Sequence, residues 1–554
     1  MDYKKLSELL FPNVDKTPQY FEELYPQRNV PKGACVTRIG PSPTGFIHLG
    51  NLYNAIIGER LAHQSGGIIF LRIEDTDSKR EVKGAVRTII KSMNHFGIHF
   101  DEGATLKKHD NNGIYAPYKQ SDRKEIYQTF AKLLVSMGYA YPCFCTQDEL
   151  ARLHEIQQRV EDNFGYYERY AIWRDRPIED VEDMLAKGEP YVLRFRSVGD
   201  INNYVYVKDG IRGELRLHEN YQDFVLLKSD GIPTYHFAHV VDDHLMRTTH
   251  VIRGEEWLAT LPIHVQLFDT LGWERPLYCH TPQLMKIDED TGKKRKLSKR
   301  QDPELALTYY VSQGYIPDAV WVYLLTVLNS NFEEWFTANA DKSYLDFPFS
   351  LDKMNKSGAL LDIPKFNDIS KEIISKLSVE DIYDGIAQWS RKYNRKFYKV
   401  FTSNPEYSKK VIGIGRSGDK PRKDIESWKQ ASKFLSFYFD DTFKRKDDFP
   451  INAQGSDKDI ILTKYLETLD FNDSQEEWFN KVRAIAEELN YALQPKKYKK
   501  NPELYKGSIV DVSNVIRVAL TGRQNSPDIY EISQAMGETM VRDRISECIE
   551  LSSS

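Results

Sequence analysis

Residues 35–51 read CVTRIGPSPTGFIHLGN and contain three successive structural signals. Residues 35–39 resemble a short buried strand, residues 40–45 form a turn rich in proline and glycine, and an apolar stripe of helical spacing begins just after the quoted segment, at Leu52. A second buried strand is predicted at residues 68–73. The sequence therefore predicts a β-loop-α-β unit whose loop lies at the carboxyl end of a parallel sheet, where nucleotides usually bind.

Composition excludes several classes of protein. The chain has 554 residues, of which 41% are hydrophobic and 28% charged, which is typical of a globular protein with several domains rather than a disordered or fibrous one. No apolar run is long enough to cross a bilayer, and the N-terminus lacks the apolar core of a signal peptide. We therefore expect a cytoplasmic protein without a membrane partner, and its five cysteines are expected to be reduced thiols.

The remaining chain shows a change of pattern. Short strands are predicted at residues 234–241 and 249–253, on the far side of a mixed segment that has the character of an insertion. From about residue 311 onward the periodicity is helical, with amphipathic stretches at residues 476–489 and 509–520.

Two short motifs carry the chemistry. In residues 41–51, Gly50 lets a flat base approach the backbone, and His48 at a helix N-terminus can donate to phosphate oxygens. The basic run KKRKLSKR at residues 293–300 follows the acidic loop DEDTG. Taken singly, the first motif is more often a capped turn and the second a solvated charge run. Their order and separation match the paired signature of class I aminoacyl-tRNA synthetases.

The residues around these motifs select one family. The sequence resembles bacterial glutamyl-tRNA synthetases in TRIGPSPTG (37–45), LRIEDTD (71–77), PTY (233–235), VVDDH (240–244), IRGEEW (252–257) and KLSKR (296–300). Glutaminyl and eukaryotic-type glutamyl enzymes typically carry Pro-Glu-Pro where this chain has PSP at residues 41–43. Residues 499–505 and 520–523 also resemble the anticodon-binding region of the bacterial branch.

The resemblance implies a fold class and an order of domains. The fold is expected to be α/β, with a Rossmann-type parallel-sheet catalytic domain, an α+β insertion and an all-helical C-terminal half. The expected divisions are an N-terminal extension (1–33), a first catalytic part (34–128), an inserted acceptor-end-binding domain (129–228), a second catalytic part with the KLSKR loop (229–310), a stem-contact region (311–390) and a helical anticodon-binding region (391–554).

The same resemblance implies the nucleotide site. Its cofactor is expected to be ATP with Mg²⁺, and no residue is assigned as a ligand of a protein-bound metal. His48, Lys296 and Lys299 are the expected catalytic residues, because adenylate formation depends on stabilising phosphate charge and needs no general base. The expected ATP-binding residues are Thr44, Gly45, His48, Gly50, Asn51, Ser298, Lys299 and Arg300.

Glutamate recognition requires cations for its side-chain carboxylate and an acceptor for its ammonium group. Arg38 and Arg253 are assigned to the carboxylate with a hydroxyl donor from Tyr235, because arginine forks bind carboxylates in a bidentate way. Glu74 is assigned to the ammonium group, beside Ser42. Without the resemblance, Arg253 and Glu74 would be interpreted as strand-end ion-pair residues. His239 is assigned to glutamate as well, although a histidine at the edge of the core is an equal alternative.

Two further features are weaker. Cys143 and Cys145 resemble half of a zinc site found in some bacterial relatives, but residues 165–174 supply no Cys or His, so no zinc is expected. Residues 495–500 (PKKYKK) interleave an aromatic ring with lysines, a pattern that suits an RNA backbone but is more often an exposed linker.

The expected partners are tRNA(Glu) and L-glutamate, and the chain is expected to be a monomer. Charging of tRNA(Gln) as well is left open, as are the residues that read the anticodon. One rival is a nucleotidylyltransferase, which is commonly far shorter. Another is a retired synthetase that acts as an RNA-binding protein, which should have lost His48, Lys299, Arg38 or Arg253.

Overall fold

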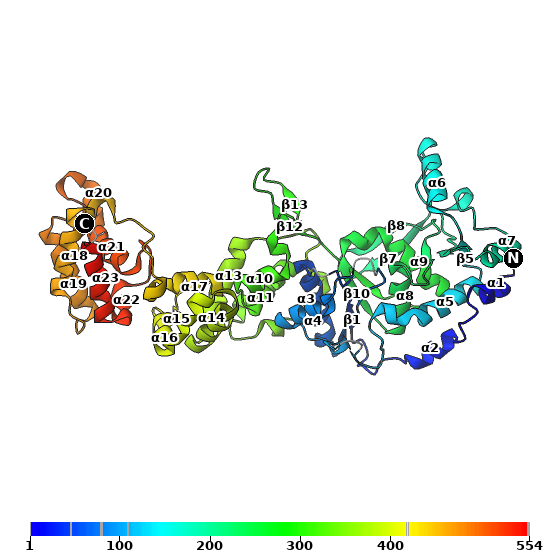
Figure 1. Cartoon of the computed structure of the whole chain (residues 1–554), viewed down its shortest axis with the longest axis horizontal. Helices are drawn as coiled ribbons and strands as arrows, with labels where there is room; N and C mark the ends of the chain where they lie inside the picture. Colours follow the sequence, from blue (N-terminus) through cyan, green and yellow to red (C-terminus); the bar gives the residue numbers. More distant parts are fainter. Residues whose placement is uncertain are drawn as a thin grey trace. The chain divides into compact units, whose positions relative to one another are not determined.

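The computed structural model describes residues 2–44, 47–77, 81–107, 110–298, 300–416, 418 and 420–550. The chain divides into two compact units (Figure 1). The first comprises Met1–Tyr309 and Val320–Asp362, and the second comprises Tyr310–Ala319 and Ile363–Ser554.

The first unit is built on a mixed sheet that, within the described residues, has eight strands in the order β4-β3-β2-β1-β10-β11-β7-β8. The strands from β3 to β7 in this order are parallel to their neighbours, while β4 and β8 are antiparallel edge strands. All four residues of β1 are buried, as expected for a parallel strand covered on both faces. Their bounds are β1 Val36–Ile39, β2 Ile68–Leu71, β3 Glu102–Ala104, β4 Asn111–Asn112, β7 Tyr204–Asp209, β8 Gly213–His218, β10 His250–Gly254 and β11 Leu277–Thr281.

The predicted β-loop-α-β unit is confirmed. Helix α3, Leu49–Gln64, follows β1 after the proline-rich turn, and β2 then pairs in parallel with β1. The strand predicted at residues 249–253 is confirmed as β10.

The strand predicted at residues 234–241 is wrong, because this segment forms helix α8, Tyr235–Leu245. Thr234 is the extended N-cap residue, and the buried Phe237, Val240 and Val241 recur at helical spacing. A short apolar run of this kind is compatible with both helix and strand until its partners are known.

The expected insertion contributes to two sheets. Strands β5 Ala140–Cys143, β6 Val192–Phe195 and β9 Val225–Leu227 form a separate antiparallel sheet. The β7–β8 hairpin, from the same expected segment, instead extends the main sheet beside β11. The insertion is therefore joined to the sheet that carries β1 and β10.

The N-terminal extension forms part of the core of the first unit. Helices α1, Tyr3–Leu10, and α2, Pro18–Leu24, pack on α5, Lys124–Ser136. Leu6 and Phe21 are buried in the same apolar cluster as residues of α5 and α8. The segment also reaches the end of α8 through ion pairs of Glu22 with His244 and Arg247.

Other described elements complete this part of the chain. They are α4 Ala85–His95, α6 Gln147–Arg159, α7 Ile178–Ala186, α9 Leu261–Leu271, α10 Leu307–Gln313, α11 Pro317–Leu328, α12 Phe332–Ala338, β12 Leu284–Ile287, β13 Lys294–Lys296 and β14 Ala359–Leu360. The last three strands form a small sheet in the order β13-β12-β14.

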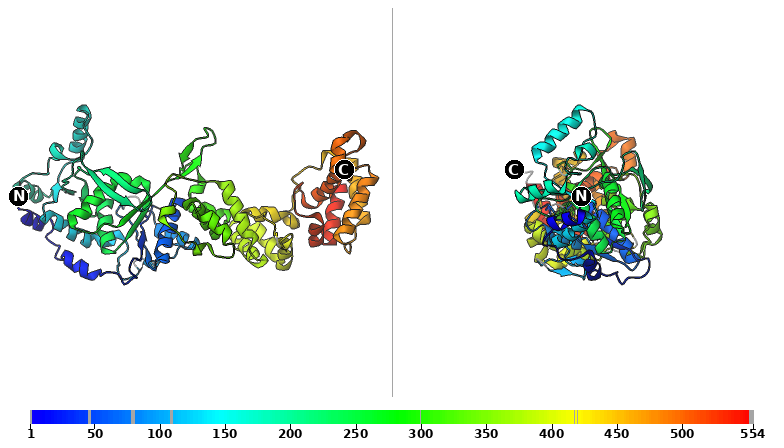
Figure 2. Two further views of the ribbon diagram at one scale, coloured as in Figure 1. Left: turned by 180° about the vertical axis from the view of Figure 1, so that it is seen from behind. Right: turned by 90° about the vertical axis from the view of Figure 1, so that its right-hand side faces the viewer.

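The second unit consists of helices joined by loops, as Figure 2 shows in yellow to red. The two amphipathic stretches predicted from sequence are confirmed as α19 and α21. Its helices are α13 Ile363–Ser375, α14 Val379–Tyr393, α15 Arg395–Ser403, α16 Pro405–Gly413, α17 Trp428–Phe434, α18 Ser456–Thr468, α19 Gln475–Glu488, α20 Pro495–Lys500, α21 Ile509–Thr521, α22 Ile529–Met536 and α23 Glu538–Glu550. Within the described residues, no helix combines the length and apolarity that a membrane span requires.

Candidate active site

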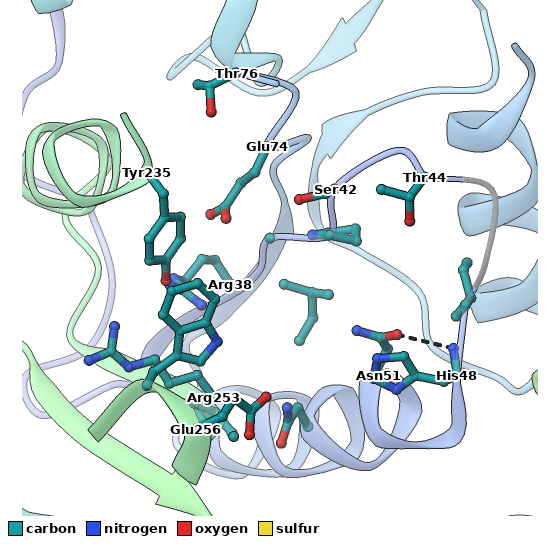
Figure 3. Close-up of a pocket in the computed structure, with 18 of the residues that line it drawn as sticks. Arg38, Ser42, Thr44, His48, Asn51, Glu74, Thr76, Tyr235, Arg253 and Glu256 are labelled. Atoms are coloured by element: carbon teal, nitrogen blue, oxygen red, sulfur yellow. Dashed lines mark hydrogen bonds between the residues drawn. The ribbon is translucent and has the colours of Figure 1, made fainter. Parts of the chain in front are cut away.

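A cavity of about 420 Å³ opens at the carboxyl ends of β1 and β10. Figure 3 shows residues from the two halves of the expected catalytic domain facing one another across it. Predicted site residues that line it are Arg38, Ser42, Thr44, His48, Asn51, Glu74, Tyr235 and Arg253. The fold thus brings together side chains that lie more than 200 residues apart in sequence.

A second cavity of about 290 Å³ shares His48, Asn54, Gly254 and Glu256 with the first. Gly50 and Lys296 also line this second cavity, so His48 stands where the two spaces meet. The pair of cavities offers one compartment lined by arginines and another reached by the lysine of β13.

Ser298 and Arg300, two other predicted nucleotide residues, have different surroundings. The backbone N–H of Ser298 donates to Asp302 Oδ2 at 2.8 Å, and Arg300 is exposed. Neither residue is among the described residues that line the two cavities. Gly45 and Lys299 lie outside the described residues.

The start of α3 is organised by a contact between His48 and Asn51. His48 is the N-cap residue, and its backbone N–H donates to Oδ1 of Asn51 at 3.1 Å. An N3 side chain that reaches back in this way satisfies a donor that the helix leaves unpaired. The contact explains what Asn51 does locally and fixes where the helix N-terminus begins beside the cavity.

A buried ion network lies behind the Arg38 side of the cavity. Asp243 accepts from Arg38 Nε at 3.2 Å and from Arg72 Nη1 at 2.7 Å. Arg72 Nη2 donates to Glu74 Oε1 at 2.9 Å. Burial would raise the pKa of the Asp243 carboxyl, but Arg38 and Arg72 hold it well below its ordinary value. The charge of Arg38 is therefore already compensated from behind.

Arg253 has a different environment. Its Nε donates to His280 Nε2 at 3.0 Å, and its Nη1 lies 3.2 Å from His264 Nδ1. Burial lowers the pKa of both imidazoles, so both rings are neutral near pH 7. Within the described residues, the buried Nη2 of Arg253 has no hydrogen-bond acceptor. This guanidinium is suited to an incoming anion, because an unpartnered buried donor is costly.

Glu74 faces the same cavity as an acidic group. Burial raises the pKa of its carboxyl, against the opposing effect of Arg72 and Arg38. A Cβ on Gly40 would overlap the Glu74 carboxylate, so glycine is needed where the turn after β1 passes Glu74. The hydrogen bond from Arg72 holds the carboxylate at the cavity wall, where it can accept from a cationic ligand group.

His239 lies beneath the cavity, and it is not among the described residues that line it. It is fully buried, with Nδ1 2.7 Å from Asp243 Oδ2 and Nε2 3.1 Å from the Tyr278 hydroxyl. Its ring stacks on that of Tyr235 with 5.6 Å between centroids. Burial lowers the pKa of His239 to about 3, so the ring is neutral. It supports Tyr235 and Asp243 from behind.

Sequence reasoning missed several residues of the cavity wall. Thr76, Glu256 and Trp257 line the cavity, although no role was assigned to them. They lie within the LRIEDTD and IRGEEW motifs, so their nearness to Glu74 and Arg253 was the available signal. Asn54, one turn after Gly50 on α3, also lines both cavities.

Cys143 and Cys145 meet at one tyrosine. Both sulfur atoms lie 3.4 Å from the hydroxyl of Tyr166, which comes from the segment that lacks Cys and His. Within the described residues, no group of three or more His, Cys, Asp or Glu side chains is arranged to hold a metal ion. Both thiols are within hydrogen-bonding distance of the Tyr166 hydroxyl.

The chain matches known families over most of its length. Residues 34–342 match the model of the catalytic domain of class I tRNA synthetases (E and Q), and residues 503–549 match an anticodon binding domain. It is 53% identical to a glutamate–tRNA ligase of Acetivibrio thermocellus, over 98% of this chain and 99% of that protein. It is 48% identical to one of Clostridium perfringens strain 13, over 98% of this chain and all of that protein.

A solved structure agrees with the sequence relatives. The glutamate tRNA ligase of Elizabethkingia meningosepticum, crystallised in complex with its amino acid, is 27% identical to this chain. The alignment covers 93% of this chain and 99% of that one, with a TM-score of 0.75. Because the identities of 53% and 48% to the two sequence relatives extend over nearly the whole length, the chain belongs to the glutamate–tRNA ligase family of class I aminoacyl-tRNA synthetases.

Proposed function

We propose that this glutamate–tRNA ligase uses ATP with Mg²⁺ to convert L-glutamate into glutamyl-adenylate and then transfers the glutamyl group to the 3′ end of tRNA(Glu). The reaction releases AMP and diphosphate. The observation that carries the proposal is the buried Arg253, whose Nη2 has no acceptor among the described residues and whose imidazole neighbours are neutral. A substrate carboxylate supplies the missing acceptor.

The amino acid occupies the larger cavity. Arg253 and Arg38 receive the side-chain carboxylate, and the Tyr235 hydroxyl donates to it. Glu74 accepts from the ammonium group, with Ser42 beside it on the turn after β1. This polarity places the α-carboxylate toward His48, where the two cavities meet.

ATP occupies the smaller cavity and the junction. Gly50 gives the base a close approach to the backbone because it has no side chain. A side chain at that position would also press on the His48 ring. His48 and the N-terminus of α3 favour phosphate oxygens, and Lys296 and Lys299 from the KLSKR segment act on the same charge. Mg²⁺ arrives with the phosphates, and Glu256 offers a carboxylate at both cavities.

The chemistry that these residues perform is alignment and charge stabilisation. The substrate α-carboxylate attacks the α-phosphorus, and diphosphate leaves with the charge that the lysines stabilise. The terminal ribose hydroxyl of tRNA then attacks the adenylate carbonyl, and AMP leaves. The match of residues 503–549 to an anticodon binding domain supports tRNA as the partner.

The choice between tRNA(Glu) alone and tRNA(Glu) with tRNA(Gln) is decided by a charging assay. Purified tRNA(Glu) and tRNA(Gln) are incubated with labelled glutamate and ATP, and the Lys299→Ala variant serves as the inactive control. We expect charging of tRNA(Glu), and charging of tRNA(Gln) would identify the non-discriminating kind. If wild-type protein charges neither tRNA, the proposal fails and the alternative of a retired synthetase that binds RNA is favoured.

Gel filtration with light scattering tests the proposed monomer, and cell fractionation tests the proposed cytoplasmic location.

A further inference from the structure

Two neighbouring parallel strands bring a histidine against Arg253. In the register of β10 and β11, Arg253 pairs with His280, and both side chains are buried. Strand β7 lies on the other side of β11 and ends at Asp209. The Asp209 carboxylate lies 2.6 Å from His280 Nδ1, and Asp209 is only 2% exposed. A buried chain of contacts therefore runs from Asp209 through His280 to Arg253.

The chemistry of these groups fixes where the protons lie. A guanidinium N–H can only donate, so His280 Nε2 must accept from Arg253 Nε. Because the neutral imidazole holds one proton, that proton is on Nδ1 and is donated to Asp209. Hydrogen bonds from His280 and from the backbone of Arg212 and Ile211 outweigh burial and hold the pKa of Asp209 below its ordinary value. Asp209 is therefore an ionised acceptor.

Asp209 itself is held at the turn of the β7–β8 hairpin. Its Oδ1 accepts the backbone N–H groups of Ile211 and Arg212, each at 2.9 Å. Its Oδ2 accepts the backbone N–H of His280 at 3.1 Å as well as the ring proton. Both oxygens are thus occupied, and the carboxylate has no freedom to rotate away from the imidazole.

We infer that Asp209 and His280 are positioning residues for glutamate recognition: Asp209 selects the His280 tautomer whose free lone pair orients the Arg253 guanidinium toward the substrate side-chain carboxylate. The inference rests on the role proposed above for Arg253. It gives the β7–β8 hairpin, which comes from the inserted segment, a part in amino-acid binding. Neither Asp209 nor His280 is among the described residues that line the cavity, so both act through Arg253.

The Asp209→Asn variant reverses the hydrogen-bond pattern without changing the shape of the side chain. Two backbone donors, of Ile211 and Arg212, lie against Oδ1, and one, of His280, lies against Oδ2 at a longer distance. The amide oxygen is therefore favoured at the Oδ1 position, which turns the amide NH₂ toward His280 Nδ1. That NH₂ drives the ring proton to Nε2, where it opposes the Nε–H of Arg253. The variant therefore places two donors against each other behind the substrate site.

Steady-state charging measures the consequence. We expect Asp209→Asn to raise KM for glutamate by about 10- to 100-fold, since a hydrogen bond to a charged group is lost. We expect kcat and KM for ATP to change by less than about threefold, because the lost interaction is made equally in the ground and transition states. Asp269→Asn, which removes an exposed ion pair with Arg275 in the same unit, is the matched control and should match wild type.

Variants at His280 provide a second, independent comparison. His280→Gln keeps one donor and one acceptor on the side chain, so Arg253 and Asp209 both retain a partner. His280→Leu keeps the side-chain volume but removes both the hydrogen-bond donor and the hydrogen-bond acceptor. We expect KM for glutamate to stay within about fivefold of wild type in His280→Gln and to rise at least as much in His280→Leu as in Asp209→Asn. Equal KM values in the two His280 variants would overturn the inference.

A spectroscopic readout separates positioning from general damage. In ¹H–¹⁵N spectra of histidine-labelled protein, the His280 signals are those missing from His280→Gln. We expect the Nδ1–H tautomer in wild type and the Nε2–H tautomer in Asp209→Asn. An unchanged tautomer, or an unchanged KM for glutamate in a folded Asp209→Asn protein, would overturn the inference.

Arg253→Gln is measured alongside to separate this inference from the proposed role of Arg253. If Arg253→Gln raises KM for glutamate and Asp209→Asn does not, only the positioning role fails. If Arg253→Gln has no effect, the proposed role of Arg253 fails as well.

Discussion

The carboxylate of Asp243 accepts the Nε–H of Arg38 at 3.2 Å, behind the larger cavity, and both side chains are buried. The same carboxylate also pairs with Arg72 at 2.7 Å, so one acidic group serves two guanidinium groups. Arg38 Nη2 also lies 3.3 Å from Nδ1 of the buried His239, so the guanidinium is held on two sides where Arg38 lines the cavity (Figure 3). Asp243, which is not among the described residues that line the cavity, therefore holds one of the residues proposed to bind glutamate.

Asp243→Asn tests this dependence. The change leaves two buried arginines without their shared carboxylate, and breaking a buried pair typically costs about 3 to 5 kcal/mol. We expect urea unfolding to show a loss of this order and the KM for glutamate to rise, with Asp269→Asn as the control. Wild-type stability together with wild-type KM would show that Arg38 is held by other contacts.

The contact between Asn51 and His48 makes a separate prediction. Asn51→Ala removes the acceptor for the His48 N–H and should lower the free energy of unfolding by about 1 kcal/mol. Asn51→Asp keeps that acceptor and suits the positive end of the helix, so stability should be unchanged or higher. The added negative charge next to the proposed phosphate site should nevertheless raise KM for ATP. Equal KM values for ATP in the two variants would contradict the proposed place of the phosphates.

The sequence predicted most of the strands and helices around this site, but it did not predict the tertiary contacts between them. Strand β1 and helix α3 form where a strand and a helix were predicted, because each has a strong local signal in its residue pattern. Residues 234–241 were assigned to the wrong element, since an apolar run of that length does not distinguish a buried strand from a helix. Tertiary packing on α9 and α5 decides that case.

Supporting residues were the part that sequence could not supply. Asp209, His264 and His280 stand in no motif that names their role. Strand register brings His280 to Arg253 and Asp209 to His280, and the packing of α9 brings His264 to Arg253. His239 is a residue for which the sequence did suggest a role but could not fix it. Its position in the chain was equally compatible with a substrate contact and with a histidine at the edge of the core, and only the structure places it beneath Tyr235.

Glu22 couples the N-terminal extension to α8 in a pH-dependent way. Burial opposes ionisation, but hydrogen bonds from His244 and Arg247 lower the pKa of Glu22 from 4.5 to about 2. A depressed folded-state pKa contributes stability above pH 4.5, and this contribution is lost as pH falls toward 2. Glu22→Gln should therefore lower the free energy of unfolding by about 1 to 2 kcal/mol at pH 6.

The pH series provides the check for Glu22. Urea unfolding of wild type and Glu22→Gln is compared between pH 6 and pH 3. The difference should shrink below about pH 4.5, because the Glu22 carboxylate of the unfolded wild-type chain then begins to protonate while that of the folded chain stays ionised. A difference that stays constant over this range would mean that the charge of Glu22 contributes nothing and that only the shape of its side chain matters.

Lys296 and Lys294 offer a matched pair on one short strand. Both lie on β13, but Lys296 lines the smaller cavity, while Lys294 is not among its described lining residues. Lys296→Ala should lower kcat/KM for ATP by about 10- to 100-fold, because a positioned cation stabilises the leaving diphosphate charge. The KM for glutamate should stay near wild type, since Arg253 and Arg38 are untouched.

The control variant Lys294→Ala removes the same charge two residues away and should change kcat/KM for ATP by less than about twofold. If both variants lose activity equally, the effect is one of general positive charge on the segment, and the specific assignment of Lys296 to the phosphates is wrong.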